Sequence, residues 1–145
     1  MISEWINRLF KNYLKFHEAD LKAHYQRPLH LQQQEFMRLM GPNANTFFGK
    51  KYGFRSIKDQ ATFAGRVPVH TYDDLWPYIE KIIGGANDVL TTGKVSWLAK
   101  TAGTTSGTSK YIPMTRNTLR RCHFKAAWYT LATLYAHHEN MRIFA

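Results

Sequence analysis

The stretch TAGTTSGTSK at residues 101–110 constrains the fold of this chain more than any other feature. Residues 101–109 hold six hydroxyl side chains, two glycines and one alanine, so none of them can anchor an apolar core. The segment before the stretch, VSWLAKT, alternates as strands do, and KYIPMT forms a second short extended run. Because the polar stretch joins two such runs, it predicts the loop of a hairpin. A linker of the same composition would separate two domains instead.

Helical periodicity predicts most of the remaining chain. An amphipathic helix is expected over residues 3–25, with its aromatic and aliphatic stripe in the core. A second helix begins at Pro28, and the Gly41-Pro42 pair is expected to end it.

Hydroxyl residues mark the starts of the later helices. Thr46 and Ser56 each precede a short helical run, and Thr71 precedes a longer one in which Pro77 predicts a bend or a new start. After the hairpin, Thr115 can cap a long helix that runs to about residue 137, and MRIFA then begins a strand. The expected apolar face of the long helix consists of Leu119, Phe124, Ala127, Leu131 and Leu134.

Length, composition and charge limit the class of protein to which the chain can belong. With 145 residues, of which 44% are hydrophobic, the chain is one ordinary domain or part of a larger one. Its net charge of +10 suits an anionic partner such as a nucleotide, a nucleic acid or a membrane surface. One cysteine excludes an internal disulfide, and the N-terminus lacks the apolar core of a signal peptide. No segment reaches the length of a membrane span, so we expect a cytoplasmic protein.

The loop contains the parts of a phosphate-binding site. Glycines let backbone N–H groups approach a phosphate, hydroxyls add donors, and a lysine supplies positive charge. The familiar mononucleotide patterns nevertheless fail on spacing. Gly103 and Gly107 are separated by three residues and Lys110 is not adjacent to a glycine, so neither G-x4-G-K-[ST] nor G-x-G-x-x-G is present.

One phosphate-loop pattern fits. The Ser/Thr/Gly loop of adenylate-forming enzymes runs [ST]-[SA]-G-[TS]-[TS]-x-G-x-x-K, and residues 101–110 follow it in order. Three further stretches, TFFGKKYGF, RVPVHTYDDLWPYIEKIIGG and LTTGKVSWLAK, precede the loop in the expected sequence. With them the chain resembles the auxin-responsive-promoter family of acyl-acid amido synthetases, and its bacterial members in particular. The resemblance covers nearly the whole chain and is strongest over residues 46–115.

This resemblance implies a fold and an activity. The fold is α/β: the helix-rich N-terminal part of the large domain of an adenylate-forming enzyme, with a short hairpin that carries the phosphate loop. Residues 1–45 would be a helical lead-in, and residues 46–145 the segment with the loop. Members of the family join a carboxylic acid to ATP, release pyrophosphate and hold an acyl-adenylate. An amine, often an amino acid, then attacks to give an amide.

The resemblance also assigns roles within the loop. The glycines would give backbone access, the central hydroxyls would donate hydrogen bonds, and the lysine would offset the charge that shifts onto the leaving pyrophosphate. Mg²⁺ would normally bridge the phosphates. The residues that would bind ATP are Thr101, Gly103, Thr104, Thr105, Ser106, Gly107 and Lys110.

The chain departs from the family pattern in three ways. Ala102 stands where serine is frequent, and Ser106 stands where glycine is frequent. The larger departure is length, because full members bind adenine, ribose and the acyl acid with later segments and close the site with a C-terminal domain. We therefore expect an N-terminal fragment that is inactive alone, and no catalytic residue is identified in it.

Two other functions stay open. An adenylate-forming relative could transfer its acyl group to coenzyme A, because the acceptor site lies outside these residues. A basic nucleic-acid-binding domain is the rival from another class, with Arg116, Arg120, Arg121 and Lys125 as a phosphate-tracking face. The histidines have no i, i+4 pair and there is one cysteine, so we expect no metal site built from protein ligands.

Overall fold

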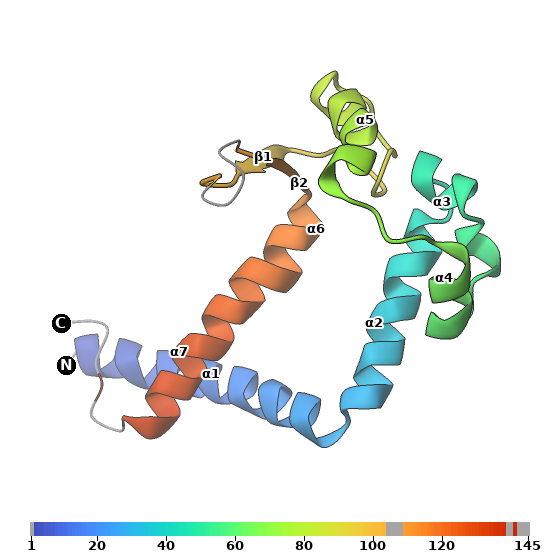
Figure 1. The fold of residues 1–145 in the computed structure, drawn as a ribbon. Coiled ribbons are helices and arrows are strands. Elements are labelled where there is room, and N and C mark those ends of the chain that lie inside the picture. Colours follow the sequence, from blue (N-terminus) through green and yellow to red (C-terminus); the bar gives the residue numbers. More distant parts are fainter. Residues whose placement is uncertain (1, 104–108, 139–140, 142–145) are drawn as a thin grey trace. The chain divides into compact units, whose positions relative to one another are not determined.

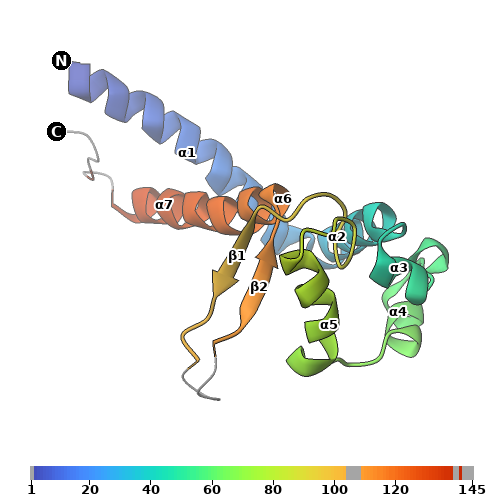
Figure 2. The same ribbon diagram turned by 90° about the horizontal axis from the view of Figure 1, so that it is seen from above.

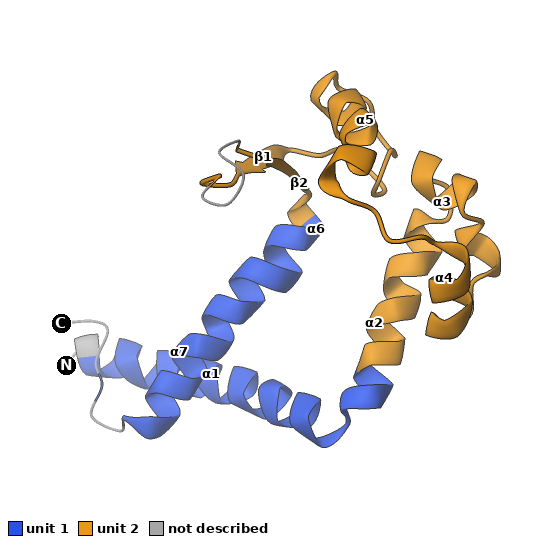
Figure 3. Cartoon of the chain, in the orientation of Figure 1, with its two compact units in different colours: residues 1–31, 117–145 blue, residues 32–116 orange. Residues whose placement is uncertain are grey.

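The computed structural model describes residues 2–103, 109–138 and 141. These residues are mostly helical and include one two-stranded sheet, which confirms the helix-rich α/β fold expected from the sequence. The chain forms two compact units (Figure 3). One consists of residues 1–31 and 117–145, and the other of residues 32–116.

The first unit is a pair of packed helices. The expected N-terminal helix is confirmed as α1 (Ile2–Gln26). α7 (Lys125–His137) crosses it in Figure 1, and Figure 2 shows the two helices side by side. Leu14 of α1 is buried against Ala132 and Tyr135 of α7. The side chains packed around these three are Phe10, Trp128, Leu131 and Met141.

The aromatic stripe of α1 is only partly buried, so the prediction that it forms core was wrong for several residues. Trp5, Leu9 and Tyr13 are each about half exposed, at 56%, 49% and 47%. In the part of the chain that the structure describes, α7 is the helix that packs along α1. One helix covers a narrower strip than this stripe, because apolar residues at i, i+3, i+4 and i+7 spread over a wide face.

The predicted apolar face of the helix after the hairpin was wrong in part: Leu131 packs against the core, but Phe124, Ala127 and Leu134 are exposed. The helical run begins at α6 (Arg116–Thr118), directly after Thr115, and passes through a π-helical segment, η2 (Leu119–Phe124), into α7. Phe124 and Leu134 are 58% and 40% exposed, whereas Ala132 and Tyr135 are buried. A π turn contains one residue more than an α turn. A face counted at α spacing through η2 therefore points in the wrong direction beyond it.

The chain's one cysteine, Cys122, lies on η2 and is exposed. The strand expected from MRIFA falls on residues 142–145, outside the described residues, apart from Met141.

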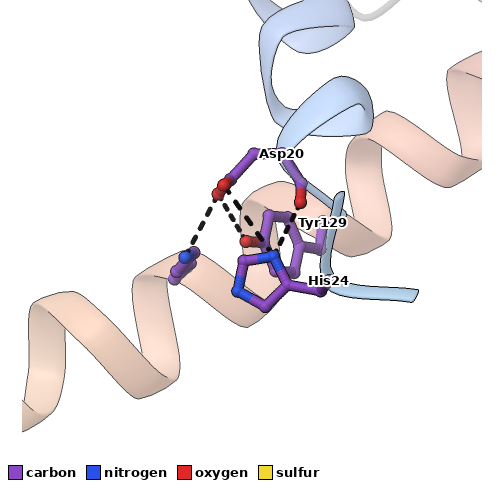
Figure 4. Close-up of polar contacts among 4 residues, drawn as sticks. Asp20, His24 and Tyr129 are labelled. Carbon is purple, nitrogen blue, oxygen red and sulfur yellow. Dashed lines mark hydrogen bonds and ion pairs between the residues drawn. The ribbon is translucent and has the colours of Figure 1, made fainter. Parts of the chain in front are cut away.

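A polar cluster also joins α1 to α7 (Figure 4). The Asp20 carboxylate accepts a hydrogen bond from the Tyr129 hydroxyl at 2.5 Å and lies 3.1 Å from the Lys125 ammonium. The His24 ring lies beside the same carboxylate, with Nδ1 at 3.8 Å. The hydrogen bond from Tyr129 holds the pKa of Asp20 below its ordinary value, and burial raises the pKa of Tyr129.

The second unit begins with four helices and a 3₁₀ turn. In chain order they are α2 (Pro28–Asn43), α3 (Phe47–Lys51), η1 (Phe54–Ser56), α4 (Gln60–Arg66) and α5 (Tyr72–Ile83), with the first four residues of α2 in the other unit. Two core clusters lie among them. Met40, Phe54 and Ile57 form one, and Tyr78, Ile82 and Val89 form the other. Phe48 packs against both clusters and so connects them.

The start of α3 is held by both a side chain and a distant backbone segment. Thr46 is 1% exposed, and its hydroxyl accepts a hydrogen bond from the Gly49 N–H, which confirms it as the N-cap. The N–H groups of Phe47 and Phe48 donate to the carbonyls of Asp88 and Val89 at 2.8 and 3.0 Å. These bonds satisfy donors that a helix N-terminus otherwise leaves without partners.

Two helix boundaries differ from those predicted. The second helix continues past Gly41-Pro42 to Asn43, whose side-chain amide also donates to the Leu39 carbonyl at 2.9 Å. Asp59, rather than Ser56, caps α4, because its carboxylate accepts from the Thr62 N–H at 2.7 Å.

Pro77 lies inside α5 and does not divide it, contrary to the prediction. The helix loses one backbone bond there. It is kept intact by burial of Tyr78, Ile79 and Ile82 and by a strong cap at its start.

The predicted hairpin is confirmed. Strand β1 (Trp97–Lys100) pairs antiparallel with β2 (Tyr111–Met114), with Trp97 opposite Met114 and Lys100 opposite Tyr111. All four residues of β1 are exposed. A two-stranded sheet this short is marginally stable by itself, so other contacts must hold it in place.

A substitution at Gly49 tests how closely the start of α3 packs against the turn before it. A Cβ at this position would lie 1.9 Å from the Asn43 carbonyl oxygen, which is backbone and cannot swing away. We expect Gly49→Ala to lower the free energy of unfolding by about 3 kcal/mol or more, as measured by urea denaturation.

Gly41→Ala is the matched control, because a Cβ there meets nothing within 4 Å and the residue lies in α2. Alanine should raise stability there by about 0.5–1 kcal/mol through helix propensity. Equal effects of the two substitutions would contradict the assigned contact.

Asp20 gives a pH-dependent test of the α1–α7 contact. Its pKa is lowered in the folded state, so its contribution is fully present above its unfolded pKa and is lost as pH falls through the folded value. We expect Asp20→Asn to cost about 1 kcal/mol or less at neutral pH, and the difference from wild type to vanish in acid.

Glu18→Gln removes the same charge from α1 but disturbs only the Lys22 pair within that helix. Denaturation curves recorded across acid pH should show a smaller effect for this control. A loss of stability in Asp20→Asn that does not change with pH would contradict the assigned contact of the Asp20 carboxylate with α7.

Candidate functional site

The predicted phosphate loop is closed at its base by two hydrogen bonds. The Thr101 N–H donates to the Lys110 carbonyl at 3.0 Å. The Lys110 N–H donates to the Thr101 hydroxyl oxygen at 2.9 Å. The hydroxyl thus replaces a carbonyl in the ladder and keeps its own proton free to donate elsewhere. Thr101 therefore fixes the neck of the loop, a role that its place in the motif did not reveal.

Gly103 occupies a conformation that suits glycine. Its φ is +70°, in the left-handed region that side chains with a Cβ rarely adopt. The backbone turns sharply there as it leaves β1. The four other predicted contact residues in the loop, Thr104, Thr105, Ser106 and Gly107, lie outside the described residues.

Tyr72 anchors the hairpin to α5. Its hydroxyl accepts a hydrogen bond from the Tyr111 N–H at 2.9 Å and donates to the Tyr111 carbonyl at 3.3 Å. One phenol therefore satisfies both outward-facing backbone groups of the residue that follows Lys110. The position of the loop's C-terminal side depends on this contact, because the hairpin itself is short and exposed.

The same tyrosine ring supports the loop lysine. The Lys110 ammonium lies 5.2 Å from the centre of the Tyr72 ring, within the range of a cation–π contact. On the other strand, the Lys100 ammonium lies 6.0 Å from the Tyr111 ring. Two cations therefore flank the neck of the loop, each beside an aromatic face. An anion bound there would meet positive charge from both strands.

The first turn of α5 holds Tyr72 in place. Thr71 and Asp74 form a capping box, in which each side chain accepts from the other residue's backbone N–H. The hydrogen bonds from Thr71 hold the pKa of Asp74 below its ordinary value, so this carboxylate stays ionised in mild acid. This start of α5 was predicted from Thr71.

Sequence reasoning missed Tyr72 itself. Its partner lies 39 residues later in the chain, so no local pattern connects the two. The one available signal was that TYDDL sits in a stretch shared with the family, but the stretch alone does not say which of its residues reaches the loop.

The groups at the neck suit a polyphosphate chemically. A hydroxyl that still carries a proton and an ammonium group are both good donors to phosphate oxygens. Among the residues that the structure describes, no three acidic, histidine or cysteine side chains gather to hold a metal ion.

The basic face proposed for nucleic acid is partly committed to internal contacts. The Lys125 ammonium pairs with Asp20, and Arg121 also has an interaction within the chain. Arg116 and Arg120 are exposed.

None of the described helices is long and apolar enough to cross a membrane.

Comparison with known proteins confirms the resemblance at the level of the family. A family model described as the GH3 family N-terminal domain matches residues 18–143. A rice (Oryza sativa subsp. indica) protein named indole-3-acetic acid-amido synthetase GH3.8 is 36% identical over 92 residues, which are 63% of this chain and 15% of that protein. A rice (subsp. japonica) protein named jasmonoyl-L-amino acid synthetase GH3.3 is 35% identical over 57% of this chain and 18% of its own length.

Solved structures agree on the fold. The chain superimposes on a structure titled "AtGH3.15 acyl acid amido synthetase in complex with 2,4-DB" with a TM-score of 0.78 and 24% identity, over 90% of this chain and 23% of the other. A second structure, titled "GH3.15 acyl acid amido synthetase", gives a TM-score of 0.73 at 26% identity, over 88% of this chain and 22% of the other. The chain thus spans less than a quarter of these related proteins. Because the family model matches most of its length, the chain belongs to the GH3 family, within that family's N-terminal domain.

Proposed function

We propose that residues 101–110 form the ATP phosphate loop of an acyl-acid amido synthetase, and that residues 1–145 are the N-terminal part of its large adenylate-forming domain. The observation that carries the proposal is the neck of the loop. Thr101 and Lys110 close the neck with two hydrogen bonds, and Tyr72 anchors the strand that follows it. The Lys110 ammonium lies beside the Tyr72 ring. The names of the relatives, which are amido synthetases, support this choice of reaction.

In the proposed reaction, a carboxylate oxygen of the acyl acid attacks the α-phosphorus of ATP. The new C–O–P linkage forms as the bond between the α-phosphorus and the bridging oxygen breaks, and pyrophosphate leaves with that electron pair. An amine then attacks the acyl carbon and releases AMP. The loop residues Thr101, Gly103, Thr104, Thr105, Ser106, Gly107 and Lys110 would stabilise the negative charge that moves onto pyrophosphate, and Mg²⁺ would supply further positive charge there.

These residues would supply phosphate binding rather than the complete reaction. We propose that the 145 residues alone bind ATP·Mg²⁺ without turnover, because no site for the acyl acid or the amine is identified among them. The single cysteine, which suits a reducing compartment, supports a cytoplasmic location.

The two alternatives make different predictions. Transfer to coenzyme A would keep ATP binding and the same loop, and the relatives' names favour an amide product over a thioester. Nucleic-acid binding predicts affinity that falls steeply with salt and shows no preference for ATP. The internal pairing of Lys125 with Asp20 weakens this second alternative.

Calorimetry with ATP·Mg²⁺ tests the proposed loop. The Lys110→Ala, Thr104→Ala double variant removes one ammonium and one hydroxyl. Charge-assisted hydrogen bonds are worth about 1.5–3 kcal/mol each, so affinity should fall by about tenfold or more.

Lys94→Ala is the control, since it removes the same charge from an exposed position in the segment before β1. An equal loss of ATP affinity in Lys94→Ala would mean that net charge alone explains the effect of the double variant. Absence of saturable binding by the folded wild-type chain would refute ATP binding by these residues.

Tyr72→Phe tests the anchor while keeping the ring beside Lys110. The Tyr111 amide loses its acceptor, so its hydrogen exchange, followed by NMR, should accelerate several-fold or more. ATP affinity should fall less than in the double variant, because the loop loses its anchor but none of its proposed donors.

Tyr52→Phe is the matched control, since that hydroxyl contacts His70 and not the hairpin. Unchanged exchange at Tyr111 in Tyr72→Phe would show that the anchor does not hold the strand.

A further inference from the structure

The segment that joins α5 to β1, residues 84–96, is the covalent connection between that helix and the hairpin (Figure 1). Tyr72 anchors β2, whereas this segment leads into β1. All of its residues are described, and none of them belongs to a helix or a strand. Contacts outside regular secondary structure must therefore hold the segment, and its shape determines where β1 begins.

The Asp88 side chain closes a turn within this segment. Its carboxylate oxygen Oδ1 accepts a hydrogen bond from the Gly93 N–H at 2.7 Å and one from the Thr92 hydroxyl at 3.3 Å. Asp88 and Gly93 have φ of +53° and +81°, so the backbone is left-handed at both ends of the turn. Aspartate adopts this conformation more readily than most residues with a Cβ. The turn, residues 88–93, thus depends on the residue type at position 88.

The turn is attached to α2 and α3 at both of its ends. The carbonyls of Asp88 and Val89 accept hydrogen bonds from the first N–H groups of α3, at 2.8 and 3.0 Å. The Thr92 N–H donates to the side-chain oxygen of Asn43, at the end of α2, at 2.8 Å. Both helices contribute side chains to the core of the second unit. The turn is therefore fixed relative to that core.

The turn also lies close to the hairpin along the chain. Residues 94–96 separate it from β1, and Val95 packs against the core cluster of Tyr78, Ile82 and Val89. The Ser96 N–H donates to the Met114 carbonyl at 3.2 Å, which extends the ladder beyond the two strands. A shift of the turn would therefore move the start of β1, and with it the neck of the loop at the other end of this short strand.

A direct role for Asp88 in phosphate binding is disfavoured by its charge. An exposed carboxylate repels a polyphosphate rather than binding it. Its hydrogen bonds go instead to its own turn. Asp88 can thus affect ATP binding through the backbone, and this effect has the opposite sign to the effect of its charge.

We propose that Asp88 is a positioning residue for the phosphate loop. Its carboxylate fixes the turn at residues 88–93, which holds the start of β1, while Tyr72 holds the backbone of β2. The loop is thereby supported from both strands. The effect on ATP binding rests on the proposed function, whereas the effect on the hairpin does not.

Hydrogen exchange followed by NMR on the full 145-residue chain tests the effect on the hairpin. Asp88→Gly removes the carboxylate but keeps a residue that adopts positive φ freely. Exchange at the Gly93 amide should accelerate by about tenfold, because that amide loses a charge-assisted bond. Exchange at Ser96 should accelerate several-fold relative to Ile82 of α5. A role confined to the turn would accelerate exchange at Gly93 without changing Ser96.

Two further variants separate the hydrogen bond from charge and from general stability. Asp88→Asn removes the charge but keeps an acceptor oxygen and a residue type that tolerates the left-handed region, so it should restore slow exchange at Ser96. Asp59→Gly is the matched control, because the Asp59 carboxylate also accepts from a backbone N–H at 2.7 Å, but at the start of α4. It should leave Ser96 exchange unchanged relative to Ile82.

Calorimetry with ATP·Mg²⁺ tests the effect on binding. Asp88→Gly should weaken ATP binding several-fold, although loss of a negative charge alone would strengthen it. Asp88→Asn loses the same charge and should bind ATP at least as tightly as wild type.

Exchange at Ser96 that accelerates no more in Asp88→Gly than in Asp59→Gly would overturn the proposal. ATP affinity of Asp88→Gly equal to that of wild type, where wild type binds, would overturn it as well. Absence of ATP binding by the wild-type chain would instead refute the proposed phosphate loop. The exchange data would still decide whether Asp88 positions the hairpin, so the two failures are distinguishable.

Discussion

The hydrogen bonds between the Tyr72 phenol and the backbone of Tyr111 are the contact on which the proposed site depends most. A hairpin of four residues per strand has little stability of its own, and all four residues of β1 are exposed. Tyr72 connects it to α5, whose own position is fixed by a capping box and by burial of Tyr78 and Ile82. A single side chain, Tyr72, therefore connects the well-packed α5 to the strand that follows the loop, and its ring also lies beside the Lys110 ammonium.

The first unit is organised differently, because its core has only two sides. α1 and α7 bury Leu14, Ala132 and Tyr135 between them, yet Trp5, Leu9 and Tyr13 remain about half exposed. The polar cluster of Asp20, Tyr129 and Lys125 adds a directional contact to this limited packing. A helix pair with so small a core gains proportionally more from specific hydrogen bonds than a larger domain does, since little buried area is available to it.

Local signals predicted the parts of the fold whose causes are local. Thr46 and Thr71 cap helices as expected because a cap needs only a side chain and an N–H three residues later. The hairpin was predictable because two alternating runs flank a loop with no apolar anchor. Ser56 and Asp59 were harder to separate, since both residue types can cap a helix and only the structure shows that Asp59 accepts from the Thr62 N–H. Pro77 misled for a related reason: tertiary burial outweighed one lost backbone bond.

The errors in the long helix and in the site arise from distant effects. The π segment at Leu119–Phe124 shifts the buried face by one residue, and nothing in its composition marks it. Tyr72 bonds to Tyr111, which lies 39 residues later, and Tyr135 is buried against Leu14 of α1, which lies far from it in sequence. Thr101, Gly103 and Lys110 were found as a motif, but the hydrogen bonds at the neck required coordinates.

The position of Cys122 has a further consequence for the chemistry of the protein. It is the chain's one thiol, and it is exposed on the π turn rather than packed against a neighbouring helix. Oxidation cannot close a disulfide within these 145 residues, so a disulfide at Cys122 needs a thiol from outside them. The same isolation makes this thiol a single attachment point for a spectroscopic label on these residues, outside the proposed phosphate loop.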